Sequence, residues 1–474
     1  MKKTLILSVS LLFTALTAGA QSLTGYFVRN STFNHEFNAA FAPDQGYVGF
    51  PFLSGVNLQV GSNLTPSKLM YPLSDGSTGL FLNHEVSADQ FLSGIRKNNY
   101  LGTNINYKLI DAGWYTWKDS FWTLSFGVKA DVDLSIPGEF MRFAKVGMNQ
   151  DPTNYCIENL GLTGQVYGQM ALGYSQGLDK WVKGLRVGGK FKFLVSMMDV
   201  QASIDRMDLS LGSQSWTART SASASVYGGG LAFRYGDDGY VDGLAFDPSA
   251  LGVGGYGAAF DLGVEYTISE GTPVDGMRFS LSVTDLGFIT YAADKSTRLS
   301  SSGEVVYEGF DGLGKDTDFN SILTTLKDDA FSMISFAPEQ SGKSRSRMMT
   351  AKLYAGVDYS FLQDKMNVGL LYTARFGKLR TENELTLAWN YAPVRSFDIA
   401  LSYSLLKTHS TIGWLITFVP KRGIGLFVGS DFTPLNYTAV NIMDALKIPV
   451  PKNELMLDVH FGLTISMGGT NARH

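Results

Sequence analysis

Apolar and polar residues alternate one by one along much of this chain, most regularly between Met348 and Phe432. In the first part of that stretch the apolar positions are Ala351, Leu353, Ala355, Val357, Tyr359 and Phe361. A period of two indicates β-strands with one apolar face. Short turns such as Gln363-Asp364-Lys365 separate the alternating runs. The pattern predicts six consecutive strands here.

The alternation recurs elsewhere and predicts about fourteen strands, an even number as in bacterial outer-membrane barrels. We place them near residues 56–61, 101–111, 122–131, 159–174, 184–199, 258–270, 277–290, 348–361, 366–377, 381–392, 396–406, 411–419, 423–431 and 454–467. Taken alternately, the connections are short on one side and mostly long on the other. Short periplasmic turns and long extracellular loops are typical of such barrels.

Alternation alone also fits a soluble β-sandwich. The predicted strands, however, are mostly longer than the five or six residues usual in soluble sheets. Aromatic residues such as Trp114, Trp122 and Tyr391 gather near strand ends, and the second strand faces carry Gly, Ser, Thr, Asn and single charges. A membrane barrel needs this combination of apolar exterior, aromatic girdles and polar interior. We predict an all-β fold, a transmembrane antiparallel β-barrel over residues 56–474 with long extracellular loops.

The N-terminus carries a secretion signal. Met1-Lys2-Lys3 is a positive region, a mostly apolar run follows from Leu5 to Ala15, and Ala18-Gly19-Ala20 resembles a cleavage site. These features predict a signal peptide over residues 1–20. With a β-barrel following, the predicted location is the outer membrane of a Gram-negative bacterium, where outer-membrane lipid surrounds the barrel.

Composition excludes several other classes. The net charge is −4 and basic runs are absent, which argues against nucleic-acid binding. The single Cys156 excludes an intrachain disulfide and a cysteine-rich metal site. The five histidines have no metal-ligand spacing, and we find no catalytic set of Ser, His and Asp. The sequence therefore predicts no enzyme activity, cofactor or metal.

The segment from residue 21 to residue 55 does not read as a membrane strand, because it is turn-rich and contains Pro51. It includes Asn38-Ala39-Ala40 shortly before the first predicted barrel strand. This order resembles the FadL-type fatty-acid transporters and their Bacteroidetes relatives, including secretion-system barrels, which have an Asn-Pro-Ala-like element there. Two further stretches are similar to a Bacteroidetes branch of these barrels, Thr284–Ile289 and Leu401–Leu406. The resemblance implies that residues 21–55 form a hatch inside the lumen, with Asn38, Ala39 and Ala40 as its motif.

Two loop segments show helix signals, one after Ser87 and one after Pro137. In the transporters that this chain resembles, loop elements build a hydrophobic capture site. By that resemblance, the ligand-contacting residues are expected to be Phe91, Leu92, Phe140 and Phe143. The alternative is that these helices only cap the barrel mouth, burying their apolar faces for stability.

The predicted inward faces carry charges of both signs, at Lys129, Asp131, Arg186, Lys190, Lys192, Asp261, Glu265, Arg278, Lys352, Arg375, Glu382 and Glu384. One interpretation is a polar track for a solute. The other is a set of lumenal ion pairs and hatch contacts, since buried charges require partners.

Two functions remain open. The first is a FadL-like channel for hydrophobic or amphipathic small molecules, with the hatch in its lumen. The second is a non-transporting structural or docking barrel of a secretion or assembly complex, whose loops bind a surface or periplasmic protein. Apolar loop helices favour the first function, and Gly-rich polar loops such as residues 200–257 favour the second.

Overall fold

The computed structural model describes residues 23–74, 78–116, 119–235, 241–268, 271, 274–307, 337–338, 343–406, 410–433, 437–443, 446–451 and 455–468. The predicted signal peptide, residues 1–20, lies outside the described residues. Within the described part of the chain, no helix is long and apolar enough to cross a membrane.

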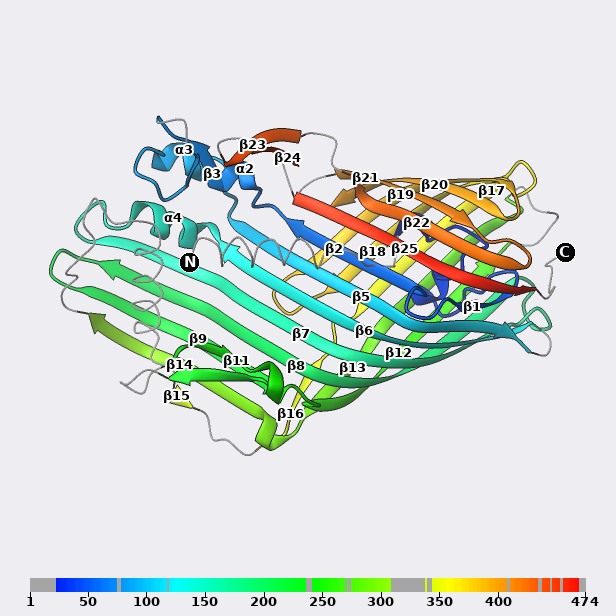
Figure 1. Ribbon diagram of the computed structural model, residues 1–474, viewed down its shortest axis with the longest axis horizontal. Helices are drawn as coiled ribbons and strands as arrows, with labels where there is room; N and C mark the ends of the chain where they lie inside the picture. Colours follow the sequence, from blue (N-terminus) through cyan, green and yellow to red (C-terminus); the bar gives the residue numbers. More distant parts are fainter. Residues whose placement is uncertain are drawn as a thin grey trace.

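Fourteen strands pair edge to edge and close into one antiparallel barrel (Figure 1). In order around the ring they are β2 (Gly55–Ser62), β5 (Asn98–Tyr115), β6 (Ser120–Pro137), β7 (Thr153–Gly177), β8 (Leu185–Leu211), β12 (Gly255–Thr267), β13 (Met277–Tyr291), β17 (Lys352–Phe361), β18 (Met366–Phe376), β19 (Thr381–Val394), β20 (Phe397–Leu406), β21 (Ser410–Phe418), β22 (Gly423–Thr433) and β25 (Leu455–Gly468). Strand β25 pairs with both β22 and β2, which closes the ring. The predicted fold and strand number are confirmed.

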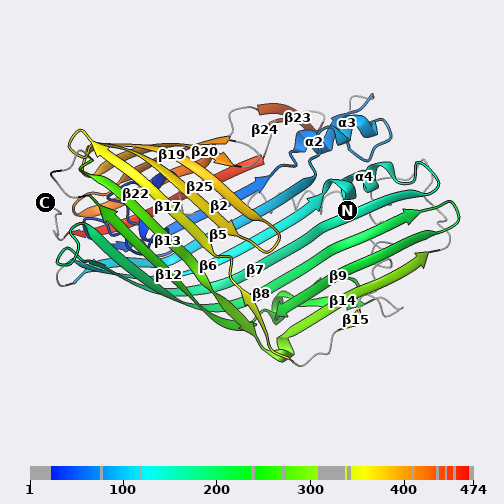
Figure 2. The same cartoon turned by 180° about the vertical axis from the view of Figure 1, so that it is seen from behind.

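The two ends of the barrel differ. Short turns such as those after β5, β17 and β21 gather at the end of the barrel where β25 ends (Figure 2). The opposite end carries the longer insertions, with the helices α2 (Pro66–Leu69), α3 (Ala88–Leu92), α4 (Gly138–Val146), η3 (Pro248–Ala250) and η4 (Ala293–Lys295). It also carries the strands β3 (Met70–Pro72), β4 (Thr78–Leu80), β9 (Trp216–Gly228), β10 (Leu231–Tyr235), β11 (Val241–Phe246), β14 (Ser296–Tyr307), β15 (Ala337–Pro338), β16 (Arg345–Met348), β23 (Tyr437–Met443) and β24 (Leu446–Pro451). This segregation matches the predicted topology.

Part of the wall continues beyond the ring as a sheet extension, formed by the ends of β7 and β8 with β9 and β14 (Figure 1). Strand β8 is 27 residues long; its first part pairs with β12 and its second part with β9. A membrane-spanning strand needs only about ten residues. The remaining length therefore projects beyond the apolar layer, on the side of the long insertions.

The barrel is apolar outside and polar inside. Across β18, β19 and β20 the outward-facing side chains of Leu370, Leu387 and Tyr403 are 43%, 51% and 45% exposed. The next position on β19, Thr386, is fully buried and hydrogen-bonded to Ser404. Comparable outward rows include Phe126, Met170, Phe191, Phe260, Leu281 and Val459. A continuous band of exposed apolar side chains is stable in contact with lipid hydrocarbon and unfavourable in contact with water.

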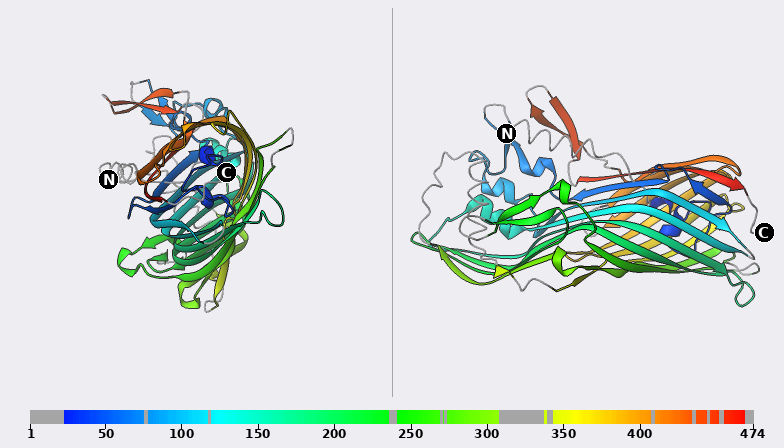
Figure 3. Two further views of the ribbon diagram at one scale, coloured as in Figure 1. Left: turned by 90° about the vertical axis from the view of Figure 1, so that its right-hand side faces the viewer. Right: turned by 60° about the horizontal axis from the view of Figure 1, so that its bottom comes forward.

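The segment expected to form a hatch divides into two parts. Residues 23–45, which we name the plug, lie inside the barrel near the end with the short turns (Figure 3). Residues Gly46–Gly49 instead form strand β1, which pairs with β25 and β5 in the wall. Its alternation is visible only over four residues, with Tyr47 fully buried and Val48 37% exposed, and so gives little strand signal.

A charge on the outer face should impair assembly more than the same charge inside. Leu387→Lys places an ammonium among Leu370 and Tyr403, at a cost of about 2 to 4 kcal/mol near the membrane midplane. Gln59→Lys puts it at a half-buried lumenal position and should be milder. Heat-modifiable gel mobility of the membrane fraction measures the folded share of each variant. Equal folded shares would contradict the assignment of faces.

Candidate functional site

The plug contains two short 3-10 turns, η1 (Leu23–Gly25) and η2 (Asn34–Glu36). Its aromatic side chains form a cluster with one half of the inner wall, in which every member is less than 6% exposed. Tyr26, for example, lies 4.9 Å from Phe27 and 5.2 Å from Phe41 between ring centroids. The cluster comprises Tyr26, Phe27, Val28, Phe33, Phe37 and Phe41 of the plug and Tyr354, Leu371, Ala388, Ala400, Leu415 and Phe427 of β17 to β22. Apolar packing therefore holds this side of the plug.

Inward-facing glycines let the plug approach the wall. Gly188 of β8 and Gly263 of β12 lie directly opposite each other in the sheet. A Cβ atom at Gly188 would come within 2.0 Å of the Ala39 carbonyl oxygen, and one at Gly263 within 1.9 Å of Asn38 Oδ1. Any larger residue would displace the plug at this point. The predicted motif thus rests on a flat surface made by two glycines.

Asn38 is fully buried and joins the plug to the wall. Its side-chain amide donates to the Val264 carbonyl at 3.1 Å, and its Oδ1 accepts from the Ala40 backbone N–H at 2.9 Å. One side chain therefore fixes the local turn and its position on β12. The two alanines that follow Asn38 are small, which suits the narrow space over Gly188.

The other half of the wall holds the plug through charges. The Lys190 ammonium donates to Glu36 Oε1 at 2.8 Å, His35 Nδ1 at 3.0 Å and the His35 carbonyl at 3.1 Å. An ammonium has three hydrogens, so the plug satisfies all of them. Lys108 approaches the same Glu36 oxygen at 3.5 Å. His35 Nε2 lies 2.6 Å from the Tyr47 hydroxyl, on the first wall strand.

Burial and the neighbouring lysines shift the pKa values of Glu36 and His35 in the plug. Burial alone would raise the pKa of Glu36, but the charges of Lys108 and Lys190 hold it well below its usual range. Burial lowers the pKa of His35, and the nearby Lys190 ammonium lowers it further. Glu36 is thus ionised and His35 neutral near pH 7. In the neutral ring Nδ1 accepts from Lys190 and Nε2–H donates to Tyr47.

Most of the lumenal charges predicted from the sequence, apart from Lys352 and Glu384, have ion-pair partners among the described residues. Lys192 contacts Asp261 and Asp285, each at 2.7 Å, and Lys129 lies 3.6 Å from Asp285. Further pairs are Arg278 with Glu265 at 3.1 Å and with Asp358 at 2.7 Å, and Arg375 with Asp131 at 3.5 Å. Arg278 also donates to the Phe27 carbonyl of the plug at 3.3 Å. These paired charges bind each other and the plug, which supports the second of the two interpretations above.

Asp431 of β22 binds the start of the plug. It accepts from the Leu23 N–H at 2.7 Å and the Thr24 N–H at 2.9 Å. Asp431, Asp458 and His460 are also the one group, among the residues that the structure describes, with atoms spaced for a metal ion. Their oxygens already accept hydrogen bonds from the plug, from Asn57 and from His460. The arrangement therefore serves plug attachment.

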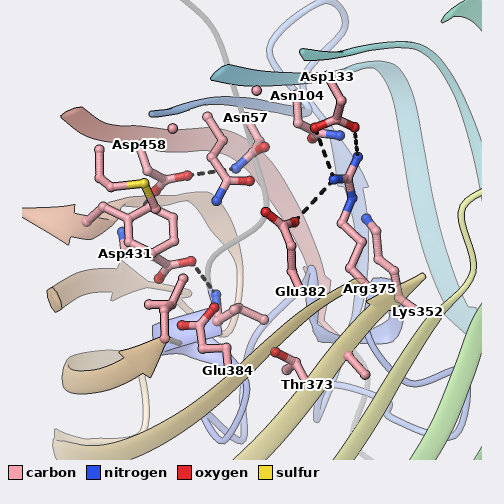
Figure 4. Close-up of a pocket in the computed structure, with 18 of the residues that line it drawn as sticks. Asn57, Asn104, Asp133, Lys352, Thr373, Arg375, Glu382, Glu384, Asp431 and Asp458 are labelled. Atoms are coloured by element: carbon pink, nitrogen blue, oxygen red, sulfur yellow. Dashed lines mark hydrogen bonds and ion pairs between the residues drawn. The ribbon is translucent and has the colours of Figure 1, made fainter. Parts of the chain in front are cut away.

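A cavity of about 150 Å³ lies against the plug (Figure 4). Leu23 and Phe37 of the plug form part of its lining, together with residues of β2, β5, β6, β17 to β20, β22 and β25. Two arginines line it: Arg375 is 3.0 Å from Asp133 and Arg380 is 2.6 Å from Glu382. The Arg380 guanidinium also lies 3.7 Å over the Tyr100 ring. A space large enough for a small solute therefore remains between the plug and the barrel wall, next to Leu23 and Phe37.

The structure separates the four expected ligand-contacting residues into two environments. Phe91 on α3 is fully buried and stacks on Phe81 at 4.3 Å, in a cluster that also includes Leu92 and Phe140. This cluster joins α3 to α4. Phe143 faces the sheet extension, 5.5 Å from Tyr155 between ring centroids. Phe91 therefore serves packing between loops, whereas Phe140 and Phe143 border the apolar inner face of the extension.

Several site residues were not predicted. Glu36, Asp111, Asp285 and Asp431 all hold or surround the plug. Alternation could have indicated Asp111 as inward-facing on β5. Asp285 adopts φ +59° at a bulge, where two successive residues, Thr284 and Asp285, are both buried. A strict period of two gives no signal for such a position.

Gly263→Val should displace the plug and leave the barrel closed. The added carbon atoms overlap Asn38 Oδ1, and overpacking of this kind costs about 1 to 3 kcal/mol. The wall hydrogen bonds are between backbones and persist. Swelling of proteoliposomes in small sugars should rise. Gly303→Val is the control, because a Cβ there meets nothing within 4 Å. Equal swelling rates would contradict the seating of the plug on Gly263.

Plug attachment should weaken as pH falls. His35 has a lowered pKa in the folded state, so the displaced plug binds a proton more readily below about pH 6.5, the usual value for histidine. Glu36 adds to the effect only below about pH 4.5, because its folded pKa is the depressed one. Sugar permeability should therefore be higher at about pH 5 than at pH 7.5. His35→Gln should flatten this difference; an unchanged difference would show that other groups cause it.

Comparison with known proteins identifies a family. A model described as "Family of unknown function (DUF5723)" matches residues 39–431. No curated protein matches the chain.

Among solved structures, the chain is similar to the toluene transporter TbuX of Ralstonia pickettii (8% identity, 91% of each chain covered, TM-score 0.38). It is also similar to the toluene transporter TodX of Pseudomonas putida (9% identity, 94% of this chain and 95% of that chain, TM-score 0.36). A FadL homologue of Pseudomonas aeruginosa gives 8% identity, 95% and 99% coverage and a TM-score of 0.41. The family model covers most of the chain, and the protein belongs to the DUF5723 family.

Proposed function

We propose that the protein is a plugged channel of the outer membrane of a Gram-negative bacterium, for hydrophobic or amphipathic small molecules. The observation that carries the proposal is the plug. The ring of fourteen strands is closed by its own backbone hydrogen bonds. The plug adds no strand to it and occupies the lumen through side-chain contacts. A closed wall with a separable plug can open without unfolding.

The outer face supports the membrane location. Apolar side chains surround the ring, and strands longer than a bilayer requires continue into the sheet extension. On that extension the outward side chains are charged instead, with Arg206 2.8 Å from Asp208 and Arg219 2.9 Å from Glu304. The change from apolar to charged fits a border between lipid and water. Outer-membrane lipid is then the partner of the apolar band.

The inner face of the extension supports an apolar solute. Tyr155, Ile157, Leu209 and Leu211 form an apolar cluster there, bordered by Phe140 and Phe143 of α4. Phe143 and Tyr155 meet edge to face. Aromatic and aliphatic side chains with few polar groups are typical of hydrophobic binding sites. In the proposed channel, the partly exposed border of this cluster at Phe140 and Phe143 meets the solute before it enters the polar lumen.

The docking function remains the alternative. The extension presents a sheet with ion pairs on its outer face, which a surface protein could contact. A docking barrel has no need for a removable plug. Permeability after plug removal therefore separates the two functions.

Deletion of residues 21–45 should leave a folded, permeable barrel. The deletion ends before β1, because β1 pairs in the wall with β25 and β5. The strands satisfy their backbone groups without the plug, so heat-modifiable gel mobility should persist. Proteoliposome swelling in small sugars should rise clearly above that of the intact mature protein. A folded barrel with unchanged swelling would contradict the channel and favour the docking role.

A further inference from the structure

The turn between β18 and β19 crosses the lumen, and we name its residues 377–380 the crossbar. Lys378 in this turn donates to Gln201 Oε1 of β8 at 2.6 Å. Leu379 lies over Gly161 of β7, where a Cβ atom would come within 2.7 Å of Leu379 Cδ2. The strands β8, β12, β13 and β17 separate β7 from β18 along the shorter way round the ring. These contacts therefore join opposite parts of the wall.

The last crossbar residue, Arg380, reaches β5 and β6. Its guanidinium lies 3.7 Å over the Tyr100 ring of β5 and 3.6 Å from Asp133 of β6. Arg375 of β18 donates to both carboxylate oxygens of Asp133, at 3.0 and 3.5 Å. Glu382 of β19 contacts both arginines, Arg375 at 3.2 Å and Arg380 at 2.6 Å (Figure 4). Paired hydrogen bonds from one guanidinium to one carboxylate fix direction and distance, so the crossbar is anchored to the far wall.

Two spaces of different size border the crossbar. The larger is the cavity of about 150 Å³, which is bounded by Leu23 and Phe37 of the plug, by Arg380 and by residues of β2, β20, β22 and β25. The smaller is about 20 Å³; Lys378 lines it, together with residues of β5, β6 and β7. Arg375 lines both. One water molecule needs about 10 to 15 Å³. Of these two spaces, only the larger has room for a solute.

The larger space fits a compact solute. An engineered cavity of about 150 Å³ can hold benzene, so the space takes about one six-membered ring. Arg375 and Arg380 are 19% and 24% exposed, and their ion pairs hold them in place. A bulkier solute therefore has to break these ion pairs before it reaches the plug.

We propose that the crossbar is the size-selecting constriction of the channel. Arg375 and Arg380, held to Asp133, admit solutes with the cross-section of about one ring and exclude bulkier ones. The proposal deepens the channel function and rests on it for its biological meaning, because it defines the size class of the solute. The constriction itself is a property of the folded barrel, and access to the cavity can be measured without transport.

Chemical labelling of a cysteine in the cavity measures this access on the full-length mature protein in detergent. Gln59→Cys places a thiol in the cavity lining, and Cys156→Ser removes the exposed native thiol. N-ethylmaleimide and fluorescein maleimide react through the same group and differ in bulk. With each rate divided by that of the heat-unfolded protein, N-ethylmaleimide should label the folded protein at least tenfold faster than fluorescein maleimide. Equal relative rates, or no labelling by the smaller reagent, would overturn the proposal.

Further variants test whether the crossbar causes the selection. Arg375→Ser combined with Arg380→Ser removes both guanidinium groups, and labelling by fluorescein maleimide should rise at least tenfold. Asp133→Asn removes the charge of the far-wall anchor at nearly constant size and should act in the same direction; it decides the question if the double variant does not fold. Arg206→Ser combined with Arg219→Ser is the control, because these arginines form ion pairs on the outer face of the extension. An unchanged rate in the folded crossbar variants, or an equal rise in the control, would contradict the constriction.

Failure of this proposal and failure of the channel give different results. Size-dependent labelling with unchanged swelling after deletion of residues 21–45 would retain the constriction and refute the channel. Increased swelling after that deletion, with labelling that does not depend on reagent size, would do the reverse.

Discussion

Backbone hydrogen bonding in lipid is the constraint on which this structure depends. No water is present in the hydrocarbon layer, so every wall N–H and C=O must find a partner in a neighbouring strand. Closing the ring between β25 and β2 meets that demand and removes both sheet edges. Closure has a second consequence: fourteen strands enclose a lumen too wide for their own side chains to fill. The plug fills part of the space that the wall side chains leave open.

The plug fills the lumen by two different kinds of contact. Toward β17–β22 it presents aromatic rings, and the wall there offers small residues such as Ala388, Ala400 and the glycines Gly369 and Gly413. Toward β5–β8 it presents Glu36 and His35 to lysines. Apolar packing tolerates small shifts, whereas the three hydrogen bonds of Lys190 fix direction and distance. The ionic side therefore sets the position of the plug, and the aromatic side supplies its apolar packing.

The sequence predicts the wall well because lipid and lumen make opposite demands on successive residues. Leu387 and Thr386 show this: one faces lipid, and the next is fully buried and polar. The plug contacts were beyond prediction because Glu36 and Lys190 lie 154 residues apart. The alternating pattern shows that Lys190 points inward. Its partner Glu36, however, lies in the plug, whose path cannot be predicted because its sequence has no regular alternation. Asp285 illustrates a further limit, since a bulge turns it inward out of phase.

The unequal sides of the plug also determine how it can move. Protonation of His35 disturbs the hydrogen bond from Lys190, and His35 is a group that titrates below neutral pH. The aromatic cluster carries no such group, because burial raises the pKa of Tyr26 to about 12. Acid therefore loosens the ionic side while the aromatic side stays packed. The plug should then swing about its aromatic contacts, and Leu23 and Thr24 remain bound to Asp431.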